Sequence, residues 1–140
     1  MIQYVYVSAA VELFSNEALV HLLRQCRENN ERLSVTGLLL YKDGNFMQLL
    51  EGPEEAVDAV IARIGEDPRH RNVIPLIRRP VEERLFPTWA MGFKHMDELL
   101  ETGESGVSTL LRSSLTAAEF YGKPDRAYKL LDSFRRVTAG

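Results

Sequence analysis

The first predicted element is a strand over residues 2–8, where the side chains alternate with a period of two. Tyr4, Tyr6 and Ser8 fall on one face, and the valines between them fall on the other. Tyr6 places a phenol among apolar neighbours, which differs from the pattern of an entirely apolar core face.

A helix follows and begins at Ser15 or Asn16, either of which can cap its first turn. Glu17 lies in that turn, where the helix dipole favours a negative charge. The apolar stripe of this helix, at helical spacing, consists of Leu19, Leu22, Leu23 and Cys26. Continued by four residues, the stripe reaches Asn30.

Two apolar runs, residues 35–41 and 46–50, are joined by Asp43-Gly44, which predicts a β-hairpin. Gly52-Pro53 ends the second strand and opens a helix with Pro at its first position. That second helix ends near Asp67-Pro68 and has one apolar face, made of Ala56, Val57, Val60, Ile61 and Ile64.

The remaining pattern predicts a strand over 73–77, a last strand over 89–93 and a helix over 124–137. Gly103 to Gly106 resembles a joint between the last strand and this helix. The inner side of the helix is expected to carry Ala127, Leu130, Leu131, Phe134 and Val137.

The element order is β-α-β-β-α-β-β, which is the ferredoxin-like plan with one added strand. The predicted fold class is therefore α+β, with a five-stranded mixed sheet and two helices on one face. The other face needs its own cover, since an apolar sheet face must be buried. We expect residues 1–93 to form the core and residues 94–140 a C-terminal helical extension that covers this face.

Composition limits the class of protein without naming a function. The 140 residues are 45% hydrophobic and 26% charged, with a net charge of −3 and one cysteine. This is the profile of a globular domain, with no run of about 18 apolar residues that would span a membrane. We expect a cytoplasmic protein with no affinity for nucleic acid or membrane.

Three polar residues interrupt apolar faces: Tyr6, Asn30 and Gln48. Each needs a partner, because an unpaired buried amide costs about 1–3 kcal/mol. Each can bond nearby backbone or face solvent. Together they can also converge on the polar edge of a flat heterocycle that has carbonyl and nitrogen groups.

Other candidate sites are weaker. No phosphate-binding glycine loop is present, and the three histidines stand at no metal-ligand spacing, so no metal site is expected. Cys26 fits a core position better than a nucleophile. Ser8, Ser34 and His70 would make a hydrolytic set only if the fold joined them. Arg69-His70-Arg71 is either a phosphate-binding cluster or a solvated loop.

The chain resembles the BLUF domains, blue-light sensors that use FAD, from about Ile2 to Phe93, and its tail resembles the extension of their short, stand-alone members. The motifs are Tyr4-Val5-Tyr6-Val7-Ser8, Asn29-Asn30, Val35-Thr36-Gly37-Leu38-Leu39-Leu40-Tyr41, Asp43-Gly44-Asn45-Phe46-Met47-Gln48-Leu49-Leu50-Glu51-Gly52, Asp67-Pro68-Arg69-His70 and Arg84-Leu85-Phe86-Pro87-Thr88-Trp89-Ala90-Met91-Gly92. Each motif is common by itself, and the set in this order and spacing is specific.

The resemblance implies a role for each matching residue. Tyr6 matches the tyrosine that donates an electron and a proton to excited flavin, and Gln48 matches the glutamine between them. Asn30 matches the asparagine at the polar edge of the ring. Ser8 matches a serine near the switch. The other ring edge and the ribityl chain are matched by Asp67, Arg69 and His70. The last-strand residues that report the switch are matched by Trp89 and Met91. The flavin is expected between the two helices, with Leu40, Phe46, Leu50 and Ile64 as walls.

The resemblance implies a photoreceptor rather than an enzyme. It binds flavin non-covalently, FAD by family habit and FMN as the alternative, and signals to a separate protein partner or through a homo-oligomer. Rearrangement of one hydrogen bond, worth about 1 kcal/mol, biases an output surface formed by residues 97–137. The alternatives are a small flavin oxidoreductase and a ferredoxin-like interaction module without a chromophore.

Overall fold

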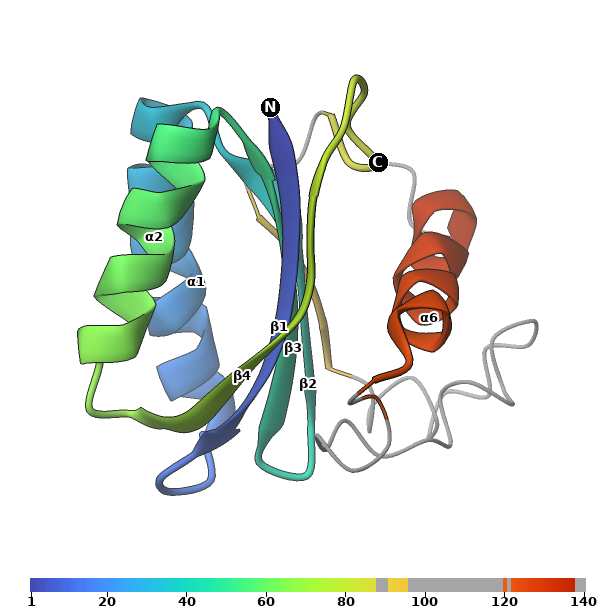
Figure 1. Cartoon of the computed structure of the whole chain (residues 1–140). Coiled ribbons are helices and arrows are strands. Elements are labelled where there is room, and N and C mark those ends of the chain that lie inside the picture. Colours follow the sequence, from blue (N-terminus) through green and yellow to red (C-terminus); the bar gives the residue numbers. More distant parts are fainter. Residues whose placement is uncertain (88–90, 96–119, 121, 138–140) are drawn as a thin grey trace.

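The computed structural model describes all residues except 88–90, 96–119, 121 and 138–140. These residues form three layers (Figure 1), with helices α1 (Asn16–Leu33) and α2 (Glu54–Glu66) on one face of a sheet and α6 (Pro124–Val137) on the other. The sheet has the spatial order β4-β1-β3-β2-β5. Its strands are β1 (Ile2–Ala10), β2 (Thr36–Lys42), β3 (Asn45–Gly52), β4 (His70–Pro80) and β5 (Gly92–His95).

The alternation of β1 divides its side chains between two cores, as predicted. Tyr4 and Tyr6 pack beneath α1 and α2, and Val5 and Val7 pack on the side of α6. The strand lies in the interior of the sheet, antiparallel to β3 on one side and to β4 on the other. Side chains on the two faces of β1 therefore pack in two separate cores.

The predicted hairpin is confirmed, with β2 and β3 antiparallel around Asp43 and Gly44. Both turn residues have positive φ, 50° for Asp43 and 77° for Gly44, as a type I′ turn requires. The hairpin fixes the β2–β3 register, so Leu39 lies opposite Gln48.

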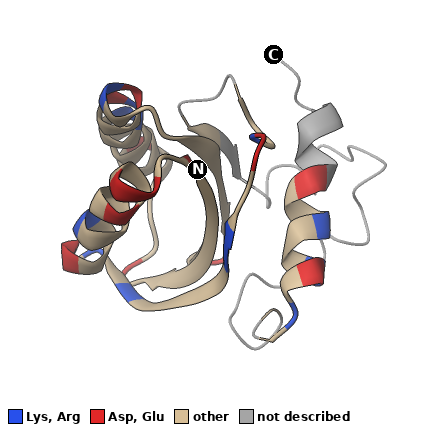
Figure 2. Cartoon of the chain, turned by 45° about the horizontal axis from the view of Figure 1, so that its top comes forward, with Lys and Arg blue, Asp and Glu red and all other residues tan. Residues whose placement is uncertain are grey.

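Local signals define the ends of both helices. Ser15 caps α1 by accepting a hydrogen bond from the N–H of Ala18, 3.1 Å away. Helix α2 begins at Glu54, so Pro53 is its N-cap rather than its first helical residue. Charged residues lie mainly on the helices and towards the sheet edge, and few interrupt the central strands (Figure 2).

The strand limits predicted for the second half of the chain need correction. Strand β4 extends beyond 73–77 at both ends because it pairs with β1 over nearly its whole length. Strand β5 begins at Gly92, where it pairs in parallel with Leu38 of β2. Met91 precedes this strand, and its carbonyl is bound by the side chain of Arg27 instead.

Helix α6 covers the sheet face opposite α1 and α2 (Figure 1). Ala127, Leu130 and Leu131 are fully buried against this face, as predicted. Leu40 belongs to the same core on the α6 side. The prediction that it forms a wall of the flavin site between α1 and α2 was therefore wrong. In β2 it is Leu39 that faces α1 and α2, because the side chains alternate.

These features confirm an α+β fold of the ferredoxin-like kind. Trp89 and residues 97–119 lie outside the part of the chain that the structure describes. Within the described part, no helix is both long and apolar enough to cross a membrane.

Candidate functional site

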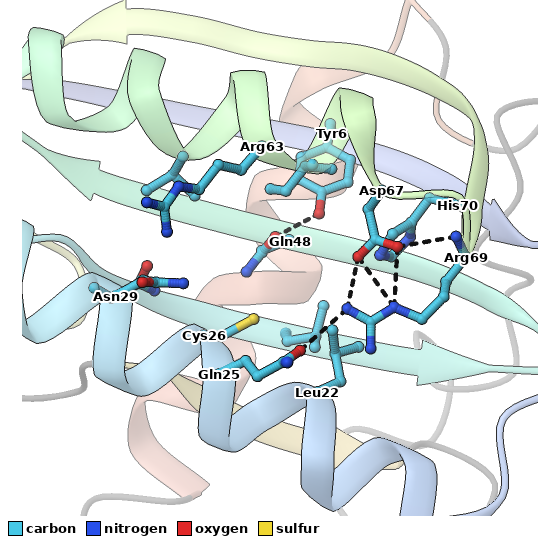
Figure 3. Close-up of a pocket in the computed structure, with 14 residues that line it drawn as sticks. Tyr6, Leu22, Gln25, Cys26, Asn29, Gln48, Arg63, Asp67, Arg69 and His70 are labelled. Atoms are coloured by element: carbon cyan, nitrogen blue, oxygen red, sulfur yellow. Dashed lines mark hydrogen bonds and ion pairs between the residues drawn. The ribbon is translucent and has the colours of Figure 1, made fainter.

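A cleft between α1 and α2 reaches down to the sheet (Figure 3). Its cavity volume is about 110 Å³, and part of the surrounding space is open to solvent. Fourteen residues line it: Tyr6, Leu22, Gln25, Cys26, Asn29, Asn30, Leu39, Gln48, Val60, Arg63, Ile64, Asp67, Arg69 and His70.

Tyr6 and Gln48 meet at the floor of this cleft, from neighbouring strands. They are direct partners in the β1–β3 register, and the Tyr6 hydroxyl donates a hydrogen bond to Oε1 of Gln48. Both side chains are buried, with exposed fractions of 1% and 2%. Burial raises the pKa of the Tyr6 phenol well above its ordinary value, so its proton stays on the oxygen.

The other end of the Gln48 amide faces Met91. Nε2 of Gln48 donates to Sδ of Met91 over 3.4 Å, and Nε of Arg27 donates to the Met91 carbonyl over 2.9 Å. Gln48 therefore contacts Met91, one of the two residues to which the resemblance assigns the report of the switch. One amide joins a phenol on β1 to a thioether in this segment.

Asn30 lines the cleft from the last turns of α1 and is 1% exposed. The structure thus brings all three polar residues of the apolar faces to one cavity. A phenol hydroxyl and two carboxamides supply both donors and acceptors, the set needed at the polar edge of a planar heterocycle.

Asp67 and Arg69 form the opposite end of the cleft (Figure 3). Nη2 of Arg69 lies 2.7 Å from Oδ2 of Asp67 and 3.2 Å from Oε1 of Gln25. The hydrogen bonds from Arg69 hold the pKa of Asp67 below its ordinary value and raise the pKa of Arg69. The hydrogen bond from Arg69 to Gln25 joins the connection between α2 and β4 to α1.

His70 lies beside this pair, with its Nδ1 3.2 Å from Oγ of Ser8. Burial lowers the pKa of its imidazole, which favours the neutral ring. Phe46 packs against it with ring centroids 5.0 Å apart. Ser8 and Phe46 therefore contact the site through His70 and are not among the residues that line the cleft.

Several lining residues were not predicted. On α1 they are Leu22, Gln25 and Asn29, while Cys26 packs against the core, as predicted, and also lines the cleft. Burial raises the pKa of the Cys26 thiol to about 11, so it is not an activated nucleophile. Arg63 was also missed, although it stands at helical spacing between Val60 and Asp67 and could have been found on that ground.

Among the described residues, no group of three or more His, Cys, Asp and Glu side chains could hold a metal ion. Ser34 does not line the cleft: its carbonyl accepts a hydrogen bond from Arg84. The cleft offers hydrogen-bond donors and acceptors from buried neutral groups at its floor and an ion pair at its other end.

The chain is similar to known proteins in both sequence and fold. The family described as "Sensors of blue-light using FAD" (BLUF) matches residues 1–92. A photoactivated adenylate cyclase subunit beta from Euglena longa is 35% identical over 119 residues, which is 83% of this chain and 14% of that protein. The blue light- and temperature-regulated antirepressor BluF of Escherichia coli is 48% identical over 48 residues, 34% of this chain and 12% of that protein.

Solved structures show the same fold. The dark-state structure of BlrB, a BLUF protein, superposes with a TM-score of 0.81 at 28% identity, covering 98% of this chain and 96% of that one. A bacterial light-regulated adenylyl cyclase gives a TM-score of 0.72 at 34% identity, over 79% of this chain and 32% of that one. With a family match over residues 1–92 and the same fold, the chain belongs to the BLUF family of blue-light sensors that use FAD.

Proposed function

We propose that the cleft between α1 and α2 binds the flavin ring, with Tyr6, Asn30 and Gln48 at its polar edge. A specific feature of Gln48 supports this fit. Among the described residues its Nε2 donates only to the sulfur of Met91, a weak acceptor, and an amide nitrogen carries two hydrogens. A ring carbonyl would supply the stronger acceptor that this buried group otherwise lacks.

Asp67, Arg69 and His70 would hold the other ring edge and the start of the side chain. Arg69 is 37% exposed at the cleft end, where it can meet a polar substituent that leads out to solvent. Ser8 and Phe46 support this end by their contacts with His70. We assign the cofactor as FAD, which the family description names, with FMN as the alternative.

The proposed function is non-enzymatic blue-light sensing through Tyr6 and Gln48. Bound flavin supplies an oxidant when it absorbs blue light. Tyr6 is the nearest phenol to the amide, and a phenol that loses an electron becomes a strong acid. Its proton then moves along the existing hydrogen bond to Oε1 of Gln48.

Return of the electron and proton can leave the Gln48 amide rotated or tautomerised. In either case its donor and acceptor pattern towards Met91 is changed, because Nε2 and Oε1 differ in hydrogen bonding. The hydrogen bond between Tyr6 and Gln48 is the observation that carries the proposal.

We further infer that residues 1–93 form the sensor and that residues 94–140 form its output extension, although the last of the five strands continues to His95. The signal passes to a separate protein partner or to a second copy of the chain, in the cytoplasm. Support for an output beyond the sensor comes from the relatives, since this chain spans only 14% of the length of the Euglena longa protein.

An absorption spectrum of the purified, flavin-loaded protein before and after blue illumination tests this function. We expect a reversible spectral shift in the wild type and its loss in Tyr6→Phe with flavin still bound. Tyr4→Phe is the matched control, since Tyr4 lies on the same face of β1 and its hydroxyl does not bond Gln48. A wild type without the shift, or steady bleaching by NADH in darkness, would contradict the proposal.

A further inference from the structure

A row of polar side chains crosses the sheet on the face covered by α6. Gln3 of β1 lies opposite Glu51 of β3 on one side and Arg79 of β4 on the other, and Thr36 of β2 lies opposite Glu51. We call Arg79, Gln3 and Glu51 the polar row. It adjoins the core of Val5, Val7 and Leu38, on the opposite side of the sheet from the cleft.

Glu51 is the centre of the polar row and is fully buried. Its carboxylate accepts hydrogen bonds from the backbone N–H groups of Leu85 and Phe86, at 2.8 and 3.0 Å. It also accepts one from Nε2 of Gln3 at 3.0 Å. The bonds to Leu85 and Phe86 tie the connection between β4 and β5 to the central strand β3.

The same row reaches helix α6. Oε1 of Gln3 accepts from Nε of Arg79 over 3.0 Å, and the guanidinium of Arg79 lies 5.0 Å from the centre of the Tyr128 ring. A cation above an aromatic face is attracted by the ring. Contacts therefore run without a gap from Tyr128 of α6 to the backbone of residues 85–86.

Burial of the Glu51 carboxylate costs free energy, and an apolar side chain could fill the same volume. Burial of a charge is unfavourable unless hydrogen bonds replace its water, and an apolar side chain of similar size often serves stability equally well. Glu51 receives N–H donors at both of its oxygens. Its specific contribution is to fix the position of Leu85 and Phe86, which provide the backbone donors.

That segment leads to the site. Leu85 and Phe86 begin the stretch of chain that ends at Met91, whose sulfur accepts from Gln48. Arg84 strengthens the same attachment by donating to Oγ1 of Thr36 at 2.9 Å and to the Ser34 carbonyl at 2.7 Å. Glu51 itself lies three residues after Gln48 on β3 and faces the opposite side of the sheet.

We propose that Glu51 is a positioning residue that fixes the backbone of Leu85 and Phe86 and, through Gln3 and Arg79, couples it to Tyr128 of α6. The proposal rests on the proposed function, in which Gln48 changes its bond to Met91. A displacement of Leu85 and Phe86 disturbs their N–H bonds to Glu51 and passes along the polar row to α6. The sensor would thus communicate with α6 across the sheet.

The first test needs neither flavin nor light. Hydrogen exchange of the full chain, followed by NMR, should show the Leu85 and Phe86 amides protected in the wild type. Glu51→Gln replaces one acceptor oxygen by an NH₂ group, so their exchange should be about tenfold faster. Unchanged exchange would overturn the positioning role whatever the outcome of the light experiment.

The second test measures coupling, with two neighbouring arginines as a matched pair. Arg79→Gln breaks the polar row, whereas Arg78→Gln removes a surface ion pair with Asp58 on the other face. Both positions are exposed, so both variants should fold. In flavin-loaded protein we compare the light-minus-dark difference in exchange over residues 124–132.

We expect Arg79→Gln to keep the spectral shift of the wild type and to lose more than half of this exchange difference, and Arg78→Gln to keep both. An equal difference in wild type and Arg79→Gln would overturn the coupling. The coupling would also be overturned if the wild type shows the spectral shift but no light-minus-dark difference in exchange over residues 124–132. Absence of the spectral shift in the wild type would instead refute the proposed function.

Discussion

Nε2 of Gln48 donates to Sδ of Met91 across 3.4 Å, while Oε1 of the same amide accepts from the Tyr6 hydroxyl. The two ends of one buried side chain therefore contact two elements far apart in the sequence. Since amide nitrogen and amide oxygen are not equivalent, any exchange of their positions changes both contacts. The predictions below test what each contact contributes.

Met91→Leu should keep flavin affinity and change the lifetime of the lit state about fivefold. Leucine fills a similar volume and removes only the sulfur acceptor, a contact worth about 1 kcal/mol at most. Recovery of the dark spectrum after a flash measures the lifetime. Met47→Leu is the control, because Met47 is equally buried on the opposite face of β3, and a similar change there would contradict the specific role of Met91.

Gln48→Leu should retain flavin and show no light-induced shift. The substitution also leaves the buried Tyr6 hydroxyl without its acceptor, which should lower the free energy of unfolding by about 1–3 kcal/mol. Absorption spectra and urea denaturation measure the two effects. Gln25→Leu, at the exposed rim of the cleft, should keep the shift, and an intact shift in Gln48→Leu would refute the role assigned to the amide.

Asp67→Asn should weaken flavin binding several-fold by releasing Arg69 from its fixed position. The lost pair should cost the unloaded protein no more than about 1 kcal/mol, because Arg69 is partly exposed and water screens the interaction. Titration of flavin fluorescence measures the affinity. Asp58→Asn breaks the ion pair with Arg78 instead and should leave the affinity unchanged.

The unloaded protein should lose stability through His70 as the pH falls below about 6.5. Burial holds the pKa of His70 below that ordinary value, so in this range the unfolded chain binds a proton that the folded chain does not. The contribution is fully present above pH 6.5 and is lost on acidification. His70→Gln should have a slope of unfolding free energy against pH that is smaller by up to about 1.4 kcal/mol per pH unit.

Urea denaturation at several pH values between 7.5 and 5 measures this slope. His21→Gln is the control, since His21 is exposed on α1. Parallel stability curves for wild type and His70→Gln would show that burial of His70 has no such effect.

Gly37→Ala should destabilise the fold by about 3 kcal/mol. A Cβ at this position would lie 1.8 Å from the carbonyl oxygen of Leu49, so the β2–β3 ladder would have to move. Gly65→Ala is the matched control: nothing lies within 4 Å of its Cβ, and the change should stabilise α2 by about 0.5–1 kcal/mol. Thermal denaturation compares the two, and equal stability of Gly37→Ala and wild type would contradict the close approach.

The local elements of this protein follow from its sequence. The Asp43-Gly44 turn, the Ser15 cap and the alternation of β1 each depend on interactions within a few residues, and each is found as predicted. The resemblance of its motifs to the BLUF family also assigns Tyr6 and Gln48 to one site. Short-range preferences such as the turn and the cap are encoded by residue type alone.

The contacts between distant elements were decided only by the tertiary structure. Periodicity shows that Leu39 and Leu40 face opposite sides, and it does not show which of them meets α1 and α2. The position of Met91 outside β5 and the burial of Glu51 beneath residues 85–86 depend on which strands become neighbours. That choice is made by the joint burial of two sheet faces, which no single stretch of the chain specifies.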